Sequence, residues 1–249
     1  MDRDLSERRA AAGVQPQKGG QAEGAVPDYL EQHYWWAYVR PGAVRLWERQ
    51  WLINLVLLGN YRRLGAAVLE ALGAFPAGRC LQIACCYGGL TVDLARRVAS
   101  SGGSLDVIDI LPVQLENLQR KLWHGAPVRT AVMDSTDLGF DDASFDQVLL
   151  FFLLHEQPPA MREQTMREAL RVLKPGGTIV VADYAPPAKW HPVRFLILPF
   201  LRLLEPFASD FWRLELAQIL PLQLDGRGWR KSTCFGGLYQ LLVRGGSGG

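Results

Sequence analysis

Small residues and carboxylates recur at regular spacing along residues 81–135. The segment Leu81–Gly89 (LQIACCYGG) places a small-residue loop after a short apolar run and before an amphipathic stretch. Such a loop lets a ligand approach the backbone and the positive end of the following helix, although the loop alone is also compatible with a tight turn. Asp109 follows Gly88 by 21 positions, about the ~20-residue offset of a carboxylate that binds ribose hydroxyls. Asp134-Ser135 comes next in matching order, so together the landmarks predict a site for a nucleoside-containing ligand.

His155 and Glu156 could move protons or bind a metal. They follow the fourth predicted strand, and open α/β sheets bind ligands at the carboxyl ends of their strands. A zinc-protease HExxH helix is excluded because two prolines interrupt it. We interpret His155 as a general base or metal ligand and Glu156 as an oxygen ligand, with an ordinary surface histidine as the alternative. Asp183 and Tyr184 end the fifth strand at the same edge, where Asp183 is either a third metal ligand or a helix cap.

Short apolar runs alternate with amphipathic stretches over the segment that must position these residues. This alternation predicts an α/β fold with a doubly wound, Rossmann-like sheet. With the closing hairpin below, we expect a sheet of seven strands whose last strand is antiparallel. Two helices are expected before it, the second ending at Leu72 with Gly73 as its cap. A hairpin with a primed turn at Gly236-Gly237 is expected to complete the sheet. The expected strands are 79–84, 104–110, 128–133, 145–153 and 178–183, the expected helices 90–99, 112–122 and 162–173, and the closing hairpin 229–235 with 238–244.

The composition excludes several classes of protein. The 249 residues are 49% hydrophobic with 8 Trp, and the formal charge of +2 gives no basic excess for a nucleic-acid surface. The longest uncharged apolar runs are much shorter than the ~20 residues of a membrane-spanning helix. The four cysteines have no zinc-ligand spacing, and with no secretory segment we expect a reducing, cytoplasmic setting.

The ordered landmarks resemble those of the class I S-adenosylmethionine-dependent methyltransferases of ubiquinone and menaquinone synthesis, over roughly residues 79–183. The acidic-x-Gly-x-Gly-x-Gly loop of that family falls on Gln82, Ala84, Cys86 and Gly88, of which only Gly88 matches outright; Tyr87 departs as well. The resemblance implies S-adenosylmethionine as cofactor. It further implies that Asp109, with Ile110 beside it, binds the ribose, and that Asp134 and Ser135 lie at the adenine. Phe151, in the fourth strand, is also expected at the cofactor.

Further segments resemble the rhodoquinone biosynthesis family, and this likeness spans most of the chain from residue 29 to 244. The segments are 34–38 (YWWAY), 51–55 (WLINL), 149–158 (LLFFLLHEQP) and 235–240 (FGGLYQ). The resemblance implies that a ring methoxy group of ubiquinone is replaced by an amino group, with S-adenosylmethionine as nitrogen donor and Mn(II) as a helper ion. His155, Glu156 and Asp183 are then the expected metal ligands, and His155, Glu156 and Tyr184 the expected catalytic residues. Methylation of a quinone or another lipophilic ring, and a non-catalytic scaffold for quinone synthesis, are the alternatives.

The neutral side chain of Gln82 suits amino transfer. A carboxylate at this position would favour the ammonium form of the cofactor's α-amino group, whose pKa is roughly 8. An amine that attacks a quinone needs its lone pair. We therefore expect Gln82, Cys86 and Tyr87 to aim the cofactor's nitrogen, rather than its methyl group, at the ring.

Aromatic residues gather in two segments that flank the predicted core. Either they complete the hydrophobic core, or they form a lid for a polyprenyl quinone that rests on the membrane surface. In the second interpretation Tyr34, Trp35, Tyr38, Trp190 and Phe195 bind the substrate. The expected division is a disordered leader (1–28), a helical lid (29–78), the S-adenosylmethionine-binding core (79–184), a lipophilic insertion (185–228), the hairpin (229–244) and a flexible tail (245–249). The expected location is peripheral, at the inner membrane.

Overall fold

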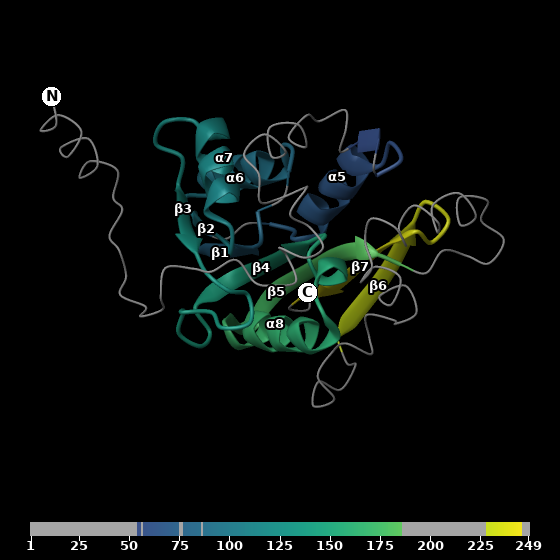
Figure 1. Cartoon of the computed structure of the whole chain (residues 1–249). Coiled ribbons are helices and arrows are strands. Elements are labelled where there is room, and N and C mark those ends of the chain that lie inside the picture. Colours follow the sequence, from purple (N-terminus) through teal and green to yellow (C-terminus); the bar gives the residue numbers. More distant parts are fainter. Residues whose placement is uncertain (1–53, 56, 75–76, 86, 186–227, 246–249) are drawn as a thin grey trace, which may run out of the picture.

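A seven-stranded sheet in the order β3-β2-β1-β4-β5-β7-β6 organises the chain (Figure 1). The computed structural model describes residues 54–55, 57–74, 77–85, 87–185 and 228–245. Strands β1 to β5 run parallel, β7 is antiparallel to β5, and β6 is antiparallel to β7. The predicted doubly wound sheet with an antiparallel last strand is confirmed. The strands are β1 (Arg79–Ile83), β2 (Ser104–Asp109), β3 (Val128–Val132), β4 (Phe145–Phe151), β5 (Leu173–Tyr184), β6 (Trp229–Cys234) and β7 (Tyr239–Arg244).

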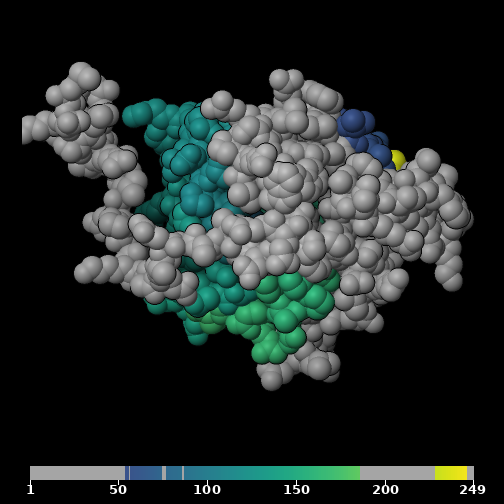
Figure 2. Space-filling model, viewed as in Figure 1, coloured from purple at the N-terminus to yellow at the C-terminus, as the bar shows by residue number. Residues whose placement is uncertain are grey.

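Helices cover both faces of this sheet. Helices α5 (Tyr61–Ala71), α6 (Leu90–Ser100) and α7 (Pro112–Lys121) lie on one face, and α8 (Pro159–Arg171) lies on the other (Figure 1). In the space-filling view, green atoms of the colour that α8 has in Figure 1 form part of the lower surface (Figure 2). A single 3-10 turn, η2 (Leu154–Glu156), follows β4. The central strands β1 and β4 are buried along most of their length because helices cover them on both sides, as is typical of parallel sheets.

The order of the strands places a switch point between β1 and β4. From β1 the chain proceeds outward to β2 and β3, then returns to β4 on the other side. Loops after β1 and β4 therefore diverge to opposite sides and leave a crevice at their carboxyl ends. The residues after β1, β2, β3, β4 and β5 all lie at this edge, which is where the sequence predicts the site.

Most expected boundaries lie within two residues of those in the structure, and three expectations differ in a more informative way. Strand β5 begins at Leu173 rather than 178, because Leu173 pairs with Phe145 and a register irregularity takes up residues 174–177. Helix α8 begins earlier than expected, at Pro159, since proline is well tolerated in the first turn. The expected two-residue hairpin turn is wrong. Cys234 pairs with Tyr239, so four residues form the connection, and three of them, 235–237, have positive φ.

Candidate active site

The loop between β1 and α6 is braced from within by Gln82. This side chain has no exposed surface, and its amide nitrogen donates to the Ala84 carbonyl and the Thr91 hydroxyl, each at 3.0 Å. A carboxylate has no hydrogen to donate and would repel that carbonyl oxygen. The departure of Gln82 from the acidic residue of the motif therefore has a structural consequence: the amide ties the loop to the first turn of α6.

Tyr61, the first residue of α5, holds the same loop from outside. Its hydroxyl donates to the Tyr87 carbonyl at 3.0 Å and accepts the Leu90 N–H at 2.9 Å. Gly88 has φ +83°, and a Cβ there would lie 2.5 Å from the Tyr61 hydroxyl. Only glycine fits this position without movement. Tyr61 could not be predicted from the sequence, because its hydrogen-bond partners lie 26 and 29 residues away and no local pattern indicates them.

Asp109 at the end of β2 has the properties of a ribose ligand. It is 9% exposed, its Oδ2 accepts the Cys85 N–H at 2.8 Å, and its Oδ1 accepts the Leu111 N–H at 2.8 Å. Burial raises the pKa of Asp109 to about 6, while those backbone N–H groups and that of Ile110 act to lower it. Each carboxylate oxygen has a second lone pair that could accept a hydroxyl hydrogen. The donor and acceptor set at this edge therefore fits the ribose of S-adenosylmethionine.

Asp134 and Ser135 follow β3 and point to different partners. Oδ1 of Asp134 accepts both the N–H and the hydroxyl of Thr136, each at 2.8 Å. The Ser135 hydroxyl lies 2.9 Å from that of Thr165 on α8 and accepts the Gln157 amide at 2.9 Å. Asp134 thus lies at the edge expected for an adenine ligand, whereas the Ser135 side chain joins the β3–β4 loop to α8.

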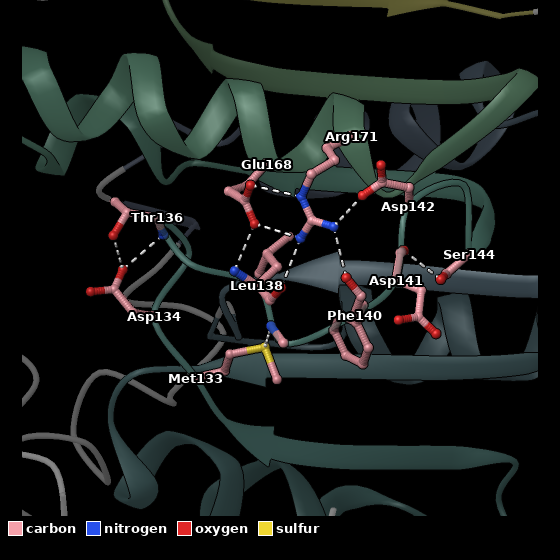
Figure 3. A network of polar contacts seen from close by, with 11 residues as sticks. Met133, Asp134, Thr136, Leu138, Phe140, Asp141, Asp142, Ser144, Glu168 and Arg171 are labelled. Atoms are coloured by element: carbon pink, nitrogen blue, oxygen red, sulfur yellow. Dashed lines mark hydrogen bonds and ion pairs between the residues drawn. The ribbon is translucent and has the colours of Figure 1, made fainter. Parts of the chain in front are cut away.

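Arg171, near the end of α8, anchors the remainder of the β3–β4 loop (Figure 3). Its guanidinium donates to the carbonyls of Leu138 and Phe140 at 2.8 Å, and it pairs with Asp142 and Glu168 at 2.7 Å. Glu168 in turn accepts the Leu138 N–H. The pKa of Glu168 is lowered, above all by its hydrogen bonds with Arg171. This network fixes the loop that begins at the candidate adenine residue.

His155 and Asp183 form a buried pair across the ends of β4 and β5. His155 Nδ1 lies 2.8 Å from Asp183 Oδ1, which also accepts the Tyr184 N–H at 2.7 Å. Asp183 Oδ2 accepts the N–H groups of Leu154 at 3.0 Å and His155 at 3.3 Å. Asp183 is 1% exposed and His155 is 3% exposed. The carboxylate caps the turn η2 and lies beside the imidazole, where it would stabilise the charged form of a general base.

Aromatic rings surround the imidazole of His155. Tyr184 lies edge-on at 4.8 Å and Phe152 at 5.9 Å between ring centroids. Phe152 itself has φ +54°, a strained conformation at the end of β4, and Phe151 packs on it at 4.9 Å. The ring centroid of Phe151 also lies 6.4 Å from that of Tyr61. These rings therefore lie between His155 and the loop that joins β1 to α6, which we call the cofactor loop.

The expected three-ligand metal site does not form. Among the residues that the structure describes, no group of three His, Cys, Asp or Glu side chains could hold a metal ion. The reason is that Asp183 faces Nδ1 of His155 and the backbone of η2, while Glu156 lies at the other nitrogen, with 3.8 Å between its Oε1 and Nε2. The three side chains do not converge, so these residues do not fit Mn(II).

The predicted substrate-binding residues cannot be placed. Tyr34, Trp35, Tyr38, Trp190 and Phe195 lie outside the described residues, as does Cys86 of the cofactor loop. The leader, most of the lid, the insertion and the tail lie outside them as well.

The described residues divide the edge of the sheet into two parts with different chemistry. The loops after β1, β2 and β3 carry groups that suit a nucleoside, and the ends of β4 and β5 carry an oriented histidine among aromatic rings. This division is typical of an enzyme that binds a nucleoside cofactor beside an apolar substrate.

Comparison with known proteins identifies the family. A family model described as a methyltransferase domain matches residues 80–177, which include all these loops up to His155 and Glu156. The chain is 31% identical over 211 residues to an uncharacterized methyltransferase of Synechocystis sp., a match that covers 83% of this chain and 92% of that protein. The chain belongs to the S-adenosylmethionine-dependent methyltransferases.

The chain is also similar to a second curated protein and to a solved structure. It is 29% identical to a ubiquinone/menaquinone biosynthesis C-methyltransferase of Azotobacter vinelandii over 80% of this chain and 81% of that protein. Among solved structures, the N-methyltransferase NodS of Bradyrhizobium japonicum with S-adenosyl-L-homocysteine has a TM-score of 0.52 at 13% identity, and the match covers 75% of this chain and 87% of that one. At that identity the structural likeness shows the fold alone.

Proposed function

We propose that this methyltransferase transfers a group from S-adenosylmethionine to the ring of a lipophilic quinone. The observation that carries the proposal is the His155–Asp183 pair, buried against Phe152 and Tyr184 beside the cofactor loop. An oriented base among aromatic rings suits a flat apolar ring that must lose a proton. The C-methyltransferase named above, a relative over most of this chain, is the further support.

Methyl transfer is the first candidate reaction, and the names of the relatives favour it. S-adenosylmethionine supplies the activated methyl group when it is bound. Nδ1 of His155 faces Asp183, so Nε2 is the nitrogen that would accept a proton from the reduced ring. Asp183 stabilises the resulting imidazolium, and the surrounding rings exclude water from it.

Amino transfer to ubiquinone, which yields rhodoquinone, is the second candidate, and one observation favours it. Gln82 is neutral and fully buried where the family motif has an acidic residue. Without that carboxylate the cofactor's α-amino group loses a nearby negative charge that would hold it protonated. The free amine could then attack the ring carbon that carries a methoxy group, and the methoxy group would leave as methanol with a proton from the amine. Formation of rhodoquinone would further require cleavage of the bond between that nitrogen and Cα of the cofactor, so that the remaining carbon skeleton leaves as the co-product.

A double-label experiment distinguishes the reactions. The protein is incubated with S-adenosylmethionine carrying ¹³C in its methyl group and ¹⁵N in its amino group, together with ubiquinone or a demethylated quinol, with and without Mn(II). Mass spectrometry of the extracted quinone then shows which atom is transferred. Label from ¹³C with formation of S-adenosylhomocysteine supports methylation, and ¹⁵N supports amination. A quinone without either label contradicts the proposal and favours the alternative that the protein is a non-catalytic scaffold for quinone synthesis.

Substitution of Gln82 tests the charge argument. We expect Gln82→Glu to suppress ¹⁵N transfer, because a carboxylate would favour the ammonium form of the cofactor. Gln82→Met is the control, since it removes the two hydrogen bonds of the amide without adding a charge. If Gln82→Glu makes amino product as fast as the wild type, or if Gln82→Met loses as much activity, charge at this position is not the cause.

The substrate also suggests where the protein works. Polyprenyl quinones reside in the bilayer, so an enzyme that modifies them must reach the membrane surface. None of the helices in the described ranges is long and apolar enough to cross a membrane. We therefore propose ubiquinone as the partner and a peripheral association with the inner membrane, through the aromatic and basic residues of segment 185–228.

A further inference from the structure

Tyr239 carries a buried hydroxyl that the proposed mechanism does not use. It begins β7 and lies opposite Tyr184 in the β5–β7 ladder. Its side chain has no exposed surface. Among the residues that the structure describes, its hydroxyl oxygen has no hydrogen-bond partner. Buried hydroxyl groups are nearly always paired, so this exception needs an explanation.

The Tyr239 hydroxyl is a neutral donor. Burial raises its pKa above the ordinary range, and the nearby thiol of Cys234 acts in the same direction. The group therefore keeps its proton at any physiological pH. A buried O–H without a partner loses the free energy of the hydrogen bond that it made with water. A ligand oxygen placed against it would restore that bond, in surroundings of low dielectric that strengthen it.

The ring of Tyr239 belongs to the same group of rings as His155. Its centroid lies 5.8 Å from that of Tyr184 and 5.9 Å from that of Phe152, the two rings that also pack on His155. Phe235, in the hairpin turn, stacks on Tyr239 at 6.3 Å. We call these four rings, Phe152, Tyr184, Phe235 and Tyr239, the aromatic cluster. The unpaired donor and the oriented base thus share one cluster at the carboxyl ends of β4 and β5.

We propose that the aromatic cluster binds the quinone ring and that the Tyr239 hydroxyl donates a hydrogen bond to one of its ring oxygens. This inference rests on the proposed function and names the group that recognises its substrate. Flat rings pack well on aromatic side chains, and a single fixed donor selects which ring oxygen turns away from the cofactor. The ring carbon presented to S-adenosylmethionine follows from that choice.

Tyr239→Phe tests this role, because it removes the hydroxyl and keeps the ring. We expect the Kd for a short-chain ubiquinone analogue, measured by quenching of tryptophan fluorescence, to rise about tenfold, which is the loss of one hydrogen bond. The Kd for S-adenosylmethionine, measured by calorimetry, should stay within twofold. The Tm should rise by about 2–4 °C, since an unpaired buried hydroxyl is removed.

Tyr61→Phe is the matched control, since it deletes a buried hydroxyl that makes two hydrogen bonds to the cofactor loop. Tyr61→Phe should lower the Tm and weaken the binding of S-adenosylmethionine, which is the opposite of the pattern expected for Tyr239→Phe. An unchanged quinone Kd in Tyr239→Phe, with quinone still bound by the wild type, overturns the inference and leaves the proposed function intact. A lower Tm in Tyr239→Phe also overturns it, because the hydroxyl then has a structural role. Failure of the wild type to bind the quinone overturns both proposals.

Discussion

Two non-glycine residues at the candidate site have left-handed backbone, Ala84 with φ +68° and Phe152 with φ +54°. This conformation costs of order 1 kcal/mol for a residue with a Cβ and persists only where surrounding contacts impose it. The Ala84 carbonyl accepts the Gln82 amide, and the Phe152 N–H donates to the Ala182 carbonyl at 2.8 Å. The strain lies in the two loops of the candidate site, after β1 and after β4, and strained residues tend to gather at functional sites.

Restoring the glycine of the family motif should relieve part of this strain. We expect Ala84→Gly to raise the free energy of unfolding by about 0.5–1 kcal/mol, the left-handed cost less the added freedom of the unfolded chain. The corresponding rise in Tm of about 1–4 °C can be followed by circular dichroism. Gly88→Ala is the reverse test and should be strongly destabilising, because its Cβ meets Tyr61. A lower Tm in Ala84→Gly would show that the loop favours alanine.

The raised pKa of Asp109 makes cofactor binding dependent on pH. Burial brings this pKa to about 6, above the unfolded value of about 3.9. The folded state therefore binds the proton more tightly, so this stabilising contribution is complete below about pH 4 and is lost as pH rises through 6. Cofactor binding has the opposite preference, because ribose hydroxyls need a carboxylate acceptor. We expect the Kd for S-adenosylhomocysteine to be flat above pH 7 and to rise about tenfold between pH 7 and pH 5.

Isothermal calorimetry across this pH range measures the effect. Asp109→Asn should bind the product more weakly at every pH and show no step near pH 6. A step that persists in Asp109→Asn would assign the titration to another group.

At the scale of elements, helix α8 holds the β3–β4 loop through one side chain. Arg171→Gln breaks the ion pairs with Glu168 and Asp142 and the bonds to two loop carbonyls. Because Glu168 is largely buried, we expect a loss of about 2 kcal/mol in the free energy of unfolding by urea. Arg167→Gln, on the same helix, breaks only an exposed pair with Glu163 and should cost less than about 0.5 kcal/mol.

The same network predicts how stability changes with acid. The lowered pKa of Glu168 means that its contribution is present above the unfolded pKa of about 4.3 and is lost as pH falls through the folded value. Wild-type stability should therefore decline below about pH 4 more steeply than that of Arg171→Gln. If the free energy of unfolding has the same pH dependence in the two proteins, Arg171 does not lower the pKa of Glu168.

The elements themselves were predictable because their signals are local. Alternating apolar runs, the proline at the start of α7 and Gly73 after α5 each determine a boundary within a few residues. The long β5 was not predictable, since its first residues pair through Phe145, far away in the sequence. The same holds for the candidate site. Asp109 could be predicted from its distance in sequence from Gly88, whereas Tyr61 and Tyr239 make contacts that form only in the folded protein.

For the molecule as a whole, the order of the strands explains why the two functions meet. The switch between β1 and β4 brings the cofactor loop and the His155 turn to one edge, and β7 inserts beside β5 to add Tyr239 from the far end of the chain. Phe152 and Tyr239, 87 positions apart in sequence, thus lie in one cluster of rings. The same edge must open toward the bilayer if the substrate is a polyprenyl quinone.

Membrane binding is therefore a property we expect of the whole protein. The protein should co-sediment with vesicles of phosphatidylethanolamine and phosphatidylglycerol that contain ubiquinone. Less protein should co-sediment at high salt, since basic residues accompany the aromatic ones in segment 185–228. The double substitution Trp190→Ser and Phe195→Ser should lower the partition coefficient about tenfold or more, because each ring contributes over 1 kcal/mol when it leaves water. Trp123→Ser is the matched control: Trp123 follows α7 and is 40% exposed, so a surface tryptophan is lost from outside that segment. Equal losses in the two variants would mean that general hydrophobicity, rather than the predicted insertion, holds the protein at the membrane.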